Sequence, residues 1–236
     1  MRFLSFYNIL KRELKTFFVS PVAYIVMAIF LIVSGWFFFS PFFLVGRADL
    51  RDFFSLLPVI LVFVVPAVTM RSFSEEYSTG SFEIISTLPV TSIDILASKF
   101  LAAFVFILVM LAPTFAYPLS ISGLGDLDWG PVIGGYIGTI LLAGLYTAVG
   151  VFASSLTKNQ IVAFISAMAV CFFFFFVDKI VFLLPSFLAD LFEFLGADFH
   201  FSNFERGLID SRDIVYFLSV TAAALFGTYI AMQEKQ

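Results

Sequence analysis

Long apolar stretches alternate with short polar connections along this chain. The apolar runs cover residues 22–44, 54–70, 100–121, 132–153, 161–181 and 213–232. A helix needs about 20 apolar residues to cross the hydrocarbon core of a bilayer, and most of these runs have that length. The second run is short and contains Pro58 and Pro66, so we expect it to be kinked or partly unwound. The pattern predicts an all-α polytopic membrane protein with six transmembrane helices and both chain ends on the same side.

Residues 1–20 show an amphipathic pattern instead of a span. Apolar side chains recur every three or four positions, at Phe3, Phe6, Tyr7, Leu10, Leu14, Phe17 and Phe18. Lys11, Arg12 and Lys15 lie mostly off that face, which predicts an interfacial helix with its basic side toward anionic lipid. A cleaved signal peptide is the alternative, but charges extend to Lys15 and no small-residue cleavage site follows a short apolar core. Pro21 is expected to end this helix and turn the chain into the bilayer.

The longest polar interruption in the first half of the chain is the segment 71–99. Its acidic residues are Glu75, Glu76, Glu83 and Asp94. Because they stand between two strongly apolar runs, the segment must lie in water. We expect it to lie against the membrane and to offer an acidic and apolar surface to a partner outside the bilayer.

Start and stop signals divide the segment 71–99 into short helices. Two pairs have the spacing of a capping box, Ser72 with Glu75 and Thr91 with Asp94. Gly80 offers a turn or C-cap after the first helix, and Ser81 can start a second one. The Leu88-Pro89 pair ends that second helix, because proline cannot continue the hydrogen-bond ladder.

The composition supports a membrane protein and excludes several kinds of site. Of the 236 residues, 61% are hydrophobic and 13% are charged, about half the charged share of a soluble domain. The single cysteine, Cys171, excludes an internal disulfide and Cys-rich metal sites, and the single histidine, His200, excludes HExxH zinc chemistry. A formal net charge of −4, without a basic cluster beyond the N-terminus, argues against a nucleic-acid partner.

The placement of Lys and Arg predicts the orientation in the membrane. One side holds the N-terminus, the segment 71–99, the loop around Lys158 and the C-terminus, and it carries most of the basic residues. These residues are concentrated in the first twenty positions, where orientation is usually decided. Acidic residues favour the opposite side but count little in this rule. We therefore place both termini and the segment 71–99 in the cytoplasm.

The connection 182–212, on the opposite side, is the second unusual stretch. After Pro185 it contains a short apolar-rich helix that Gly196 can end. About ten residues cannot cross a bilayer, so we expect a shallow re-entrant or interfacial helix that plugs the outer end of the bundle. Ser211 is the expected N-cap of the last span, with Asp213 in its first turn.

Several residues admit two interpretations. His200 is interpreted as a hydrogen-bonding loop residue, with a pH switch as the alternative. Asp178 and Lys179 are expected to mark the outer boundary of the fifth span, with an ion pair inside a path as the alternative. The glycines of the run 132–153 indicate close helix packing more than a substrate path. The sequence contains no phosphate-binding loop and no nucleophile elbow, so we expect no catalytic site in this chain.

These features together resemble an ABC-2 type transporter permease over nearly the whole chain, and more narrowly the gliding-motility F permease family. The similar stretches are PAVTMRSFSEE (66–76), the Gly80, Glu83 and Leu88-Pro89 pattern, LTKNQIVAF (156–164) and FHFSNFERGLIDSRDIVYFLSV (199–220). The resemblance implies a homodimer of six-span subunits in the bacterial inner (cytoplasmic) membrane. It also implies a separate ABC ATPase at the cytoplasmic face, which would bind ATP and Mg²⁺, while this chain would bind no cofactor.

The resemblance assigns roles to particular segments of a single transmembrane domain, 1–236. Residues 71–99 correspond to the coupling segment that fits a cleft on the ATPase, and the matching positions are Arg71, Glu75, Glu76, Gly80, Glu83 and Pro89. Residues 1–20 correspond to the connecting helix that rides on the same ATPase, and residues 182–212 to the external re-entrant segment. In gliding bacteria a further membrane-anchored subunit with an extracytoplasmic domain completes the assembly.

A coupling element must transmit a rigid-body push, so we expect it to be short, stiff and capped at both ends without help from neighbouring helices. Ser72, Gly80, Pro89 and Thr91 are the expected boundaries. Closure of paired ATPases would then rock the attached spans and alternate access at the dimer interface. Two functions remain open: a permease that exports or extracts a substrate, and a non-transporting scaffold that transmits ATPase motion to an extracytoplasmic partner.

Overall fold

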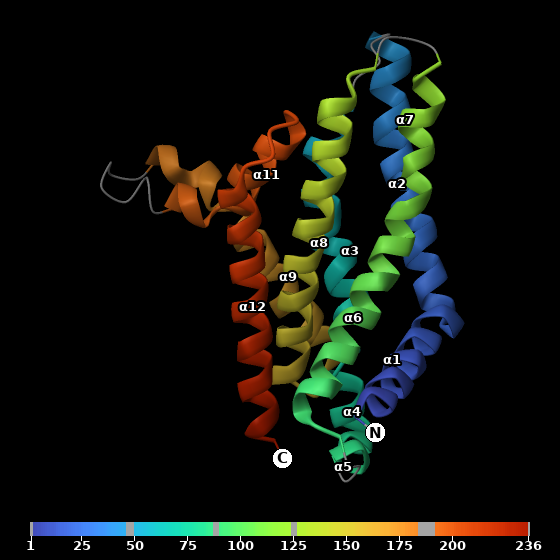
Figure 1. Ribbon diagram of the computed structural model, residues 1–236, viewed down its shortest axis with the longest axis vertical. Coiled ribbons are helices and arrows are strands. Elements are labelled where there is room, and N and C mark those ends of the chain that lie inside the picture. Colours follow the sequence, from blue (N-terminus) through green and yellow to red (C-terminus); the bar gives the residue numbers. More distant parts are fainter. Residues whose placement is uncertain (1, 46–49, 87–89, 124–126, 184–191, 236) are drawn as a thin grey trace.

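The computed structural model describes residues 2–45, 50–86, 90–123, 127–183 and 192–235, which form an elongated helical bundle (Figure 1). Its helices are α1 (Arg2–Val19), α2 (Pro21–Val45), α3 (Arg51–Thr69), α4 (Ser74–Thr79), α5 (Ser81–Ser86), α6 (Ser92–Leu111), η1 (Ala112–Phe115), α7 (Ala116–Ile121), α8 (Trp129–Leu156), α9 (Gln160–Phe176), η2 (Asp178–Leu183), α11 (Ala197–Glu205) and α12 (Ser211–Gln233). Every regular element within these ranges is a helix, so the all-α prediction is confirmed. Both ends of the chain lie at the same end of the bundle as α4 and α5 (Figure 1).

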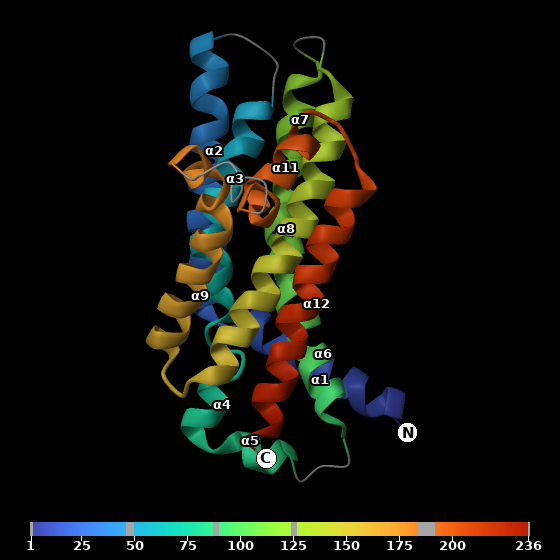
Figure 2. The ribbon, with the colours of Figure 1, turned by 90° about the vertical axis from the view of Figure 1, so that its left-hand side faces the viewer.

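Helix α8 forms the centre of the bundle, with α3, α6, α9 and α12 packed around it (Figure 2). Its glycines let neighbouring helices approach closely. A Cβ added at Gly150 would lie 2.0 Å from Thr69 Oγ1 on α3, and one at Gly138 would lie 2.7 Å from Phe204 Cβ on α11. These positions therefore serve close helix packing, as the sequence indicated.

Five helical stretches in the described part of the chain are long and apolar enough to cross a membrane. They are Pro21–Ser40, Arg51–Thr79, Ser92–Ile121, Trp129–Leu156 and Ser211–Gln233. The span expected over residues 161–181 is instead the 17-residue helix α9, which ends at Phe176 and is followed by the 3₁₀ helix η2. At about 1.5 Å per residue α9 is about 26 Å long, shorter than a hydrocarbon core of about 30 Å. Six spans are predicted from the sequence, whereas the described part of the chain contains five helices of sufficient length.

Local signals set several helix boundaries as expected. Helix α1 ends at Val19, and α2 begins two residues later at Pro21. Thr91 and Asp94 form a capping box: Thr91 Oγ1 accepts from the Asp94 N–H at 3.3 Å, and Asp94 Oδ2 accepts from the Thr91 N–H at 3.3 Å. Because of this cap, α6 begins at Ser92, well before the apolar run that starts near residue 100.

One expectation was wrong, and another was wrong in part. Helix α3 is helical through Pro58 and Pro66, so it is not partly unwound there, and both prolines are buried against the rest of the bundle. Such packing tolerates proline in a transmembrane helix. The N-cap of α12 is Asp210 and not Ser211, since Asp210 has the extended backbone of a cap and its Oδ1 accepts from the Arg212 N–H at 2.9 Å.

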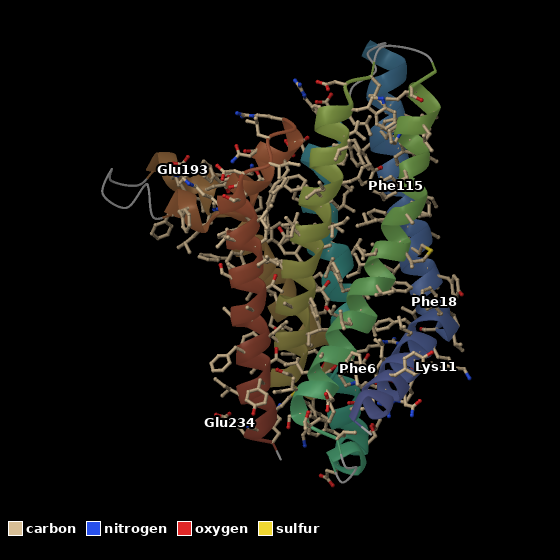
Figure 3. The ribbon with its side chains drawn as sticks, in the orientation of Figure 1. Phe6, Lys11, Phe18, Phe115, Glu193 and Glu234 are labelled. Carbon is tan, nitrogen blue, oxygen red and sulfur yellow. The ribbon has the colours of Figure 1, made fainter. Side chains whose placement is uncertain are left out.

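Helix α1 packs along α6. Among its side chains whose burial is described, Ile9 and Glu13 are buried, whereas Tyr7, placed on the apolar face by the sequence, is 53% exposed. Lys11 and Lys15 are exposed, and Lys11 points away from the bundle (Figure 3). The helix is therefore amphipathic as predicted, and the residues that it buries against the bundle include the acidic Glu13.

In the half of the bundle away from α4, η2, α11 and the start of α12 lie to one side of α8, while α2, α7 and α8 extend beyond them (Figure 1). His200 on α11 is buried, with its Nδ1 2.6 Å from Asp213 Oδ1 and its Nε2 3.0 Å from the Phe194 carbonyl oxygen. Asn203 Nδ2 donates to the second oxygen of Asp213 at 2.9 Å. His200 is thus a hydrogen-bonding residue as predicted, although it belongs to a helix.

The boundary after α9 carries the charged pair that the sequence singled out. Asp178 and Lys179 lie in η2, outside α9, and Lys179 Nζ forms an ion pair with Asp198 Oδ2 at 2.6 Å. Residues 192–195 are helical and Gly196 separates them from α11. The predicted start of the re-entrant helix near Pro185 lies outside the described residues.

Candidate functional site

The predicted coupling segment folds into two short helices, α4 and α5, at the end of the bundle that holds both termini (Figure 1). Gly80 separates them with a φ of 71°, the left-handed conformation that glycine adopts without strain. Ser81 starts α5, as the sequence indicated. The path of the chain beyond α5, including Pro89, lies outside the described residues.

The start of α4 is capped by a neighbouring helix and not by its own capping box. Ser154 Oγ on α8 accepts from the backbone N–H groups of Phe73 at 3.0 Å and Ser74 at 3.1 Å, and it donates to the Met70 carbonyl at 2.9 Å. Ser72, the predicted cap, precedes the helix, and its buried Oγ has no hydrogen-bond partner in the described part of the chain. The expectation of a self-capped element was therefore wrong, because Ser154 on α8 accepts hydrogen bonds from the two backbone N–H groups at the start of α4.

An apolar cluster below this cap ties α4 and α5 to four other helices. Its buried members are Ile9, Phe73, Tyr77, Phe82, Ile95, Leu96, Val151 and Met232. The rings of Tyr77 and Phe82 meet edge to face with centroids 4.8 Å apart, which fixes α5 against α4. Contacts to α1, α6, α8 and α12 leave α4 little freedom to move independently of the bundle.

A group of four charged side chains joins α4 to α1 and α6. Lys99 on α6 is 2% exposed at its side chain, and its Nζ lies 2.9 Å from Glu76 Oε1 on α4 and 3.4 Å from Glu13 Oε1 on α1. Arg12, on the solvent side, lies 2.7 Å from Glu13 Oε1 and 3.2 Å from Glu76 Oε1. We call these four residues the junction network.

The junction network is balanced in charge, which is the condition for burying it. Lys99 has almost no access to water, and the side chains of Glu13 and Glu76 are only 12% and 15% exposed. Two cations face two carboxylates, so each buried charge has an opposite partner. Lys99 also lies 5.2 Å from the centre of the Phe73 ring. The Glu76 carboxylate is therefore engaged in ion pairs within the protein, with Lys99 and Arg12.

A cavity of about 440 Å³ lies beside the junction network. Its walls come from α1, the beginning of α2, the end of α3, α4 and α6. Arg71, Ser72 and Glu75 line it together with the network residues, and Val22, Val26, Val68 and Phe106 supply an apolar wall. The cavity thus joins a charged region to an apolar one.

The structure brings some of the predicted site residues together and separates others. Arg71 and Glu75 are exposed and line the cavity with Glu76. Glu83 is exposed on α5 and does not line this cavity. Of the predicted interfacial basic residues, only Arg12 belongs to the junction network.

Three contributors to the site were missed by sequence reasoning. Glu13 is the single acidic residue in the first 20 positions, so its place on an otherwise basic and apolar helix was a signal for a buried pair. Lys99 opens a long apolar run, where an unpaired cation would be costly. Ser154 gave no signal, because a serine inside an apolar helix is common and its partner lies 80 residues away.

The C-terminal end of α12 also contacts this site. Lys235 Nζ donates to the Ser155 carbonyl at 2.7 Å and lies 4.3 Å from the centre of the Tyr77 ring on α4. Burial lowers the pKa of the Lys235 ammonium, and the nearby charge of Lys158 lowers it further. Lys235, two residues beyond the end of α12, therefore contacts α4 through Tyr77.

Comparison with known proteins identifies the family of this chain. No curated protein matches it significantly. A family profile described as "ABC-2 family transporter protein" matches residues 7–195, which include the junction network, α4 and α5 and end before α11. The match extends over most of the chain, and the family's membrane components typically have no catalytic activity of their own and work with an ABC ATPase. The chain therefore belongs to the ABC-2 family of transporter proteins.

Proposed function

We propose that this chain is the permease subunit of an ATP-driven ABC-2 transporter and that α4 with α5 receives the movement of a separate ABC ATPase. The arrangement of α4 carries the proposal. Glu75 and Glu83 are exposed on the α4–α5 pair, while the opposite face of the pair is anchored to four other helices. A docking element needs both properties, because it must contact the partner and pass the movement on.

The junction network and Ser154 provide the route for such a movement. A displacement of α4 acts on α1 and α6 through Glu76 and Lys99, and on α8 through Ser154. Packed helices respond to such a push by shifting as rigid bodies between discrete arrangements. This supports a coupling role for Arg71, Glu75, Glu76, Gly80 and Glu83, and the same role is proposed for Pro89.

The larger assembly is also part of the proposal. In it, α9 extended by η2 is a sixth span, and two copies of the chain form a homodimer in the bacterial cytoplasmic membrane. The basic α1 supports a cytoplasmic position for both termini, α4 and α5. ATP and Mg²⁺ belong to the partner ATPase. The resemblance of residues 199–220 to the gliding-motility F permeases suggests an additional membrane-anchored subunit with an extracytoplasmic domain.

A second candidate function is transmission of ATPase motion without transport. The observation that favours it is the continuity of α8, which contacts α4 through Ser154 at one end and α11 through Gly138 at the other. One helix thus connects the proposed ATPase side with the external segment. Transport of candidate substrates by vesicles containing the complex, compared with ATPase stimulation alone, separates this function from a permease.

The coupling role is tested by co-purification of a tagged ABC ATPase from the same genome with this chain. Glu75→Lys reverses an exposed charge on α4 without touching the junction network, so we expect it to reduce recovery of the chain with the ATPase. Glu234→Lys is the matched control, because Glu234 is an exposed acid at the same end of the bundle (Figure 3). Equal recovery of the Glu75→Lys and Glu234→Lys variants would contradict docking through α4.

A further inference from the structure

The cavity beside the junction network has two chemically distinct halves. One half is apolar and is formed by Val22 and Val26 of α2, Val68 of α3 and Phe106 of α6. The other half is polar and belongs to α1, α4, the turn before α4 and Lys99 of α6. Since α2 starts its apolar stretch at Pro21, the boundary between the halves lies at the end of a membrane-spanning segment. This is the level at which a phospholipid changes from head group to acyl chain.

The charges that line the polar half are balanced. The lining includes the basic residues Arg12, Arg71 and Lys99 and the acidic residues Glu13, Glu75 and Glu76. The junction network neutralises four of them internally. Arg71 and Glu75 are the remaining pair, so the cavity offers one further cation and one further anion to a ligand. A purely anionic or purely cationic molecule would satisfy only one of the two.

Two buried polar atoms beside the cavity have no hydrogen-bond partner among the described residues. They are Ser72 Oγ and Glu76 Oε2, and both residues line the cavity. Ser72 is only 8% exposed. An unpaired buried polar atom costs about 1–3 kcal/mol, so these atoms call for a ligand or water that provides a donor to the carboxylate and a partner to the hydroxyl.

A phosphoethanolamine group has the required chemistry. Its phosphate can accept hydrogen bonds from the guanidinium of Arg71 and the hydroxyl of Ser72. Its primary ammonium can donate to Glu76 Oε2 and can pair with the opposite charge of Glu75, which also lines the cavity. A volume of about 440 Å³ is in the range of small-molecule sites, which extends from about 300 to 1,000 Å³.

We propose that this cavity binds a zwitterionic phospholipid with a primary amine, its phosphoethanolamine group in the polar half and the upper part of an acyl chain against α2 and α3. The lipid completes the hydrogen bonding of Ser72 and Glu76 and fills the space between α1 and α4. It is a structural ligand of the permease and not its transported cargo. The proposal concerns the chain alone and does not depend on docking of an ATPase.

Native mass spectrometry of the full-length, delipidated protein tests the proposal. The protein is incubated with palmitoyl-oleoyl phosphatidylethanolamine, with the matching phosphatidylcholine, whose trimethylated amine cannot donate, and with the matching phosphatidylglycerol, which lacks the amine. We expect phosphatidylethanolamine to be retained about tenfold more than the other two lipids, as loss of a charge-assisted hydrogen bond implies. Soluble glycerophosphoethanolamine, which lacks acyl chains, should not compete.

Three variants assign the binding to this cavity. Arg71→Gln removes the proposed phosphate ligand, and Ala67→Phe fills the apolar wall without changing charge. Both should lower retention of phosphatidylethanolamine about tenfold while the far-ultraviolet circular dichroism stays unchanged. Lys158→Gln is the control, because Lys158 is an exposed cation in the loop between α8 and α9 and does not line the cavity.

Four results would overturn the proposal. Equal retention of phosphatidylcholine would remove the role of the amine, and preferential retention of phosphatidylglycerol would indicate a simple anion site. Effective competition by glycerophosphoethanolamine would show that binding does not need contact between an acyl chain and the apolar wall. Unchanged retention by both Arg71→Gln and Ala67→Phe would place any bound lipid elsewhere on the protein.

Discussion

Replacing Lys99 by methionine should destabilise the protein strongly. Methionine keeps an unbranched side chain as far as Cε but lacks the terminal ammonium, so Glu76 and Glu13 lose the buried cation at 2.9 and 3.4 Å. Removing one partner of a buried ion pair costs about 3–5 kcal/mol. We expect a loss near the lower limit, about 3 kcal/mol, because Arg12 still pairs with both carboxylates and each carboxylate retains some contact with water.

The same reasoning predicts that the loss can be reversed. The triple change Lys99→Met, Glu13→Gln and Glu76→Gln removes the buried charges together, so no carboxylate is left without its cation. Buried charge networks can often be replaced by neutral groups at little cost, since desolvation of the charges is avoided. The triple variant should therefore recover most of the stability lost by Lys99→Met, with Arg12 left as an exposed cation of small energetic importance.

Reversible unfolding in mixed micelles, with increasing sodium dodecyl sulfate and circular dichroism at 222 nm, measures both effects. Lys158→Met serves as the control because this lysine is exposed at the same end of the protein, and its change should stay within about 0.5 kcal/mol. The interpretation of Lys99 as a buried charge would be refuted by a loss below about 1 kcal/mol in Lys99→Met. It would also be refuted if the triple variant were no more stable than the single one.

Three further predictions concern packing, pH and orientation. Gly150→Val should lower the free energy of unfolding by about 1–3 kcal/mol in the same assay, because its Cβ collides with α3, whereas Gly144→Ala should be tolerated since its nearest neighbour is 3.6 Å away. Burial and a nearby aspartate raise the pKa of Glu205 to about 7. The folded state therefore holds the carboxyl proton more tightly than the unfolded state, so the free energy of unfolding should fall as pH rises from 5 to 8. Glu205→Gln should flatten that pH dependence. Orientation can be tested in a background in which the single native cysteine is replaced by alanine. Ser78→Cys should react with an impermeant maleimide only in inside-out vesicles, and Leu208→Cys only in right-side-out vesicles. The reverse pattern would contradict a cytoplasmic α4.

Features governed by neighbouring residues were the most predictable from sequence. The capping box at Thr91 and Asp94, the left-handed Gly80 and the break before Pro21 depend on a few adjacent positions, and the structure has all three. Apolar run length likewise gave five of the expected spans. The N-cap of α12 shows the limit of such signals, because Asp210 and Ser211 are both residue types that cap helices and the structure uses Asp210.

The candidate site was less predictable because its contacts are made between distant segments. Ser72 has the sequence signature of a cap, yet Ser154 takes that role from across the bundle. Glu76 looked like an exposed docking residue, but Lys99 holds it inside the junction network. A single sequence shows which residues can pair, whereas the packing of three helices decides which ones do.

The same packing explains how a short helix can influence a long bundle. A six-residue helix has too few internal hydrogen bonds to be stable alone, so its rigidity must come from its surroundings. Here Ser154 fixes its start, Lys99 binds its carboxylate and Lys235 covers Tyr77 on its remaining side. A force applied to α4 is consequently distributed to α6, α8 and α12 and cannot be absorbed by local unfolding unless one of these contacts breaks first. Weakening any one of them should therefore uncouple α4 before it unfolds the bundle.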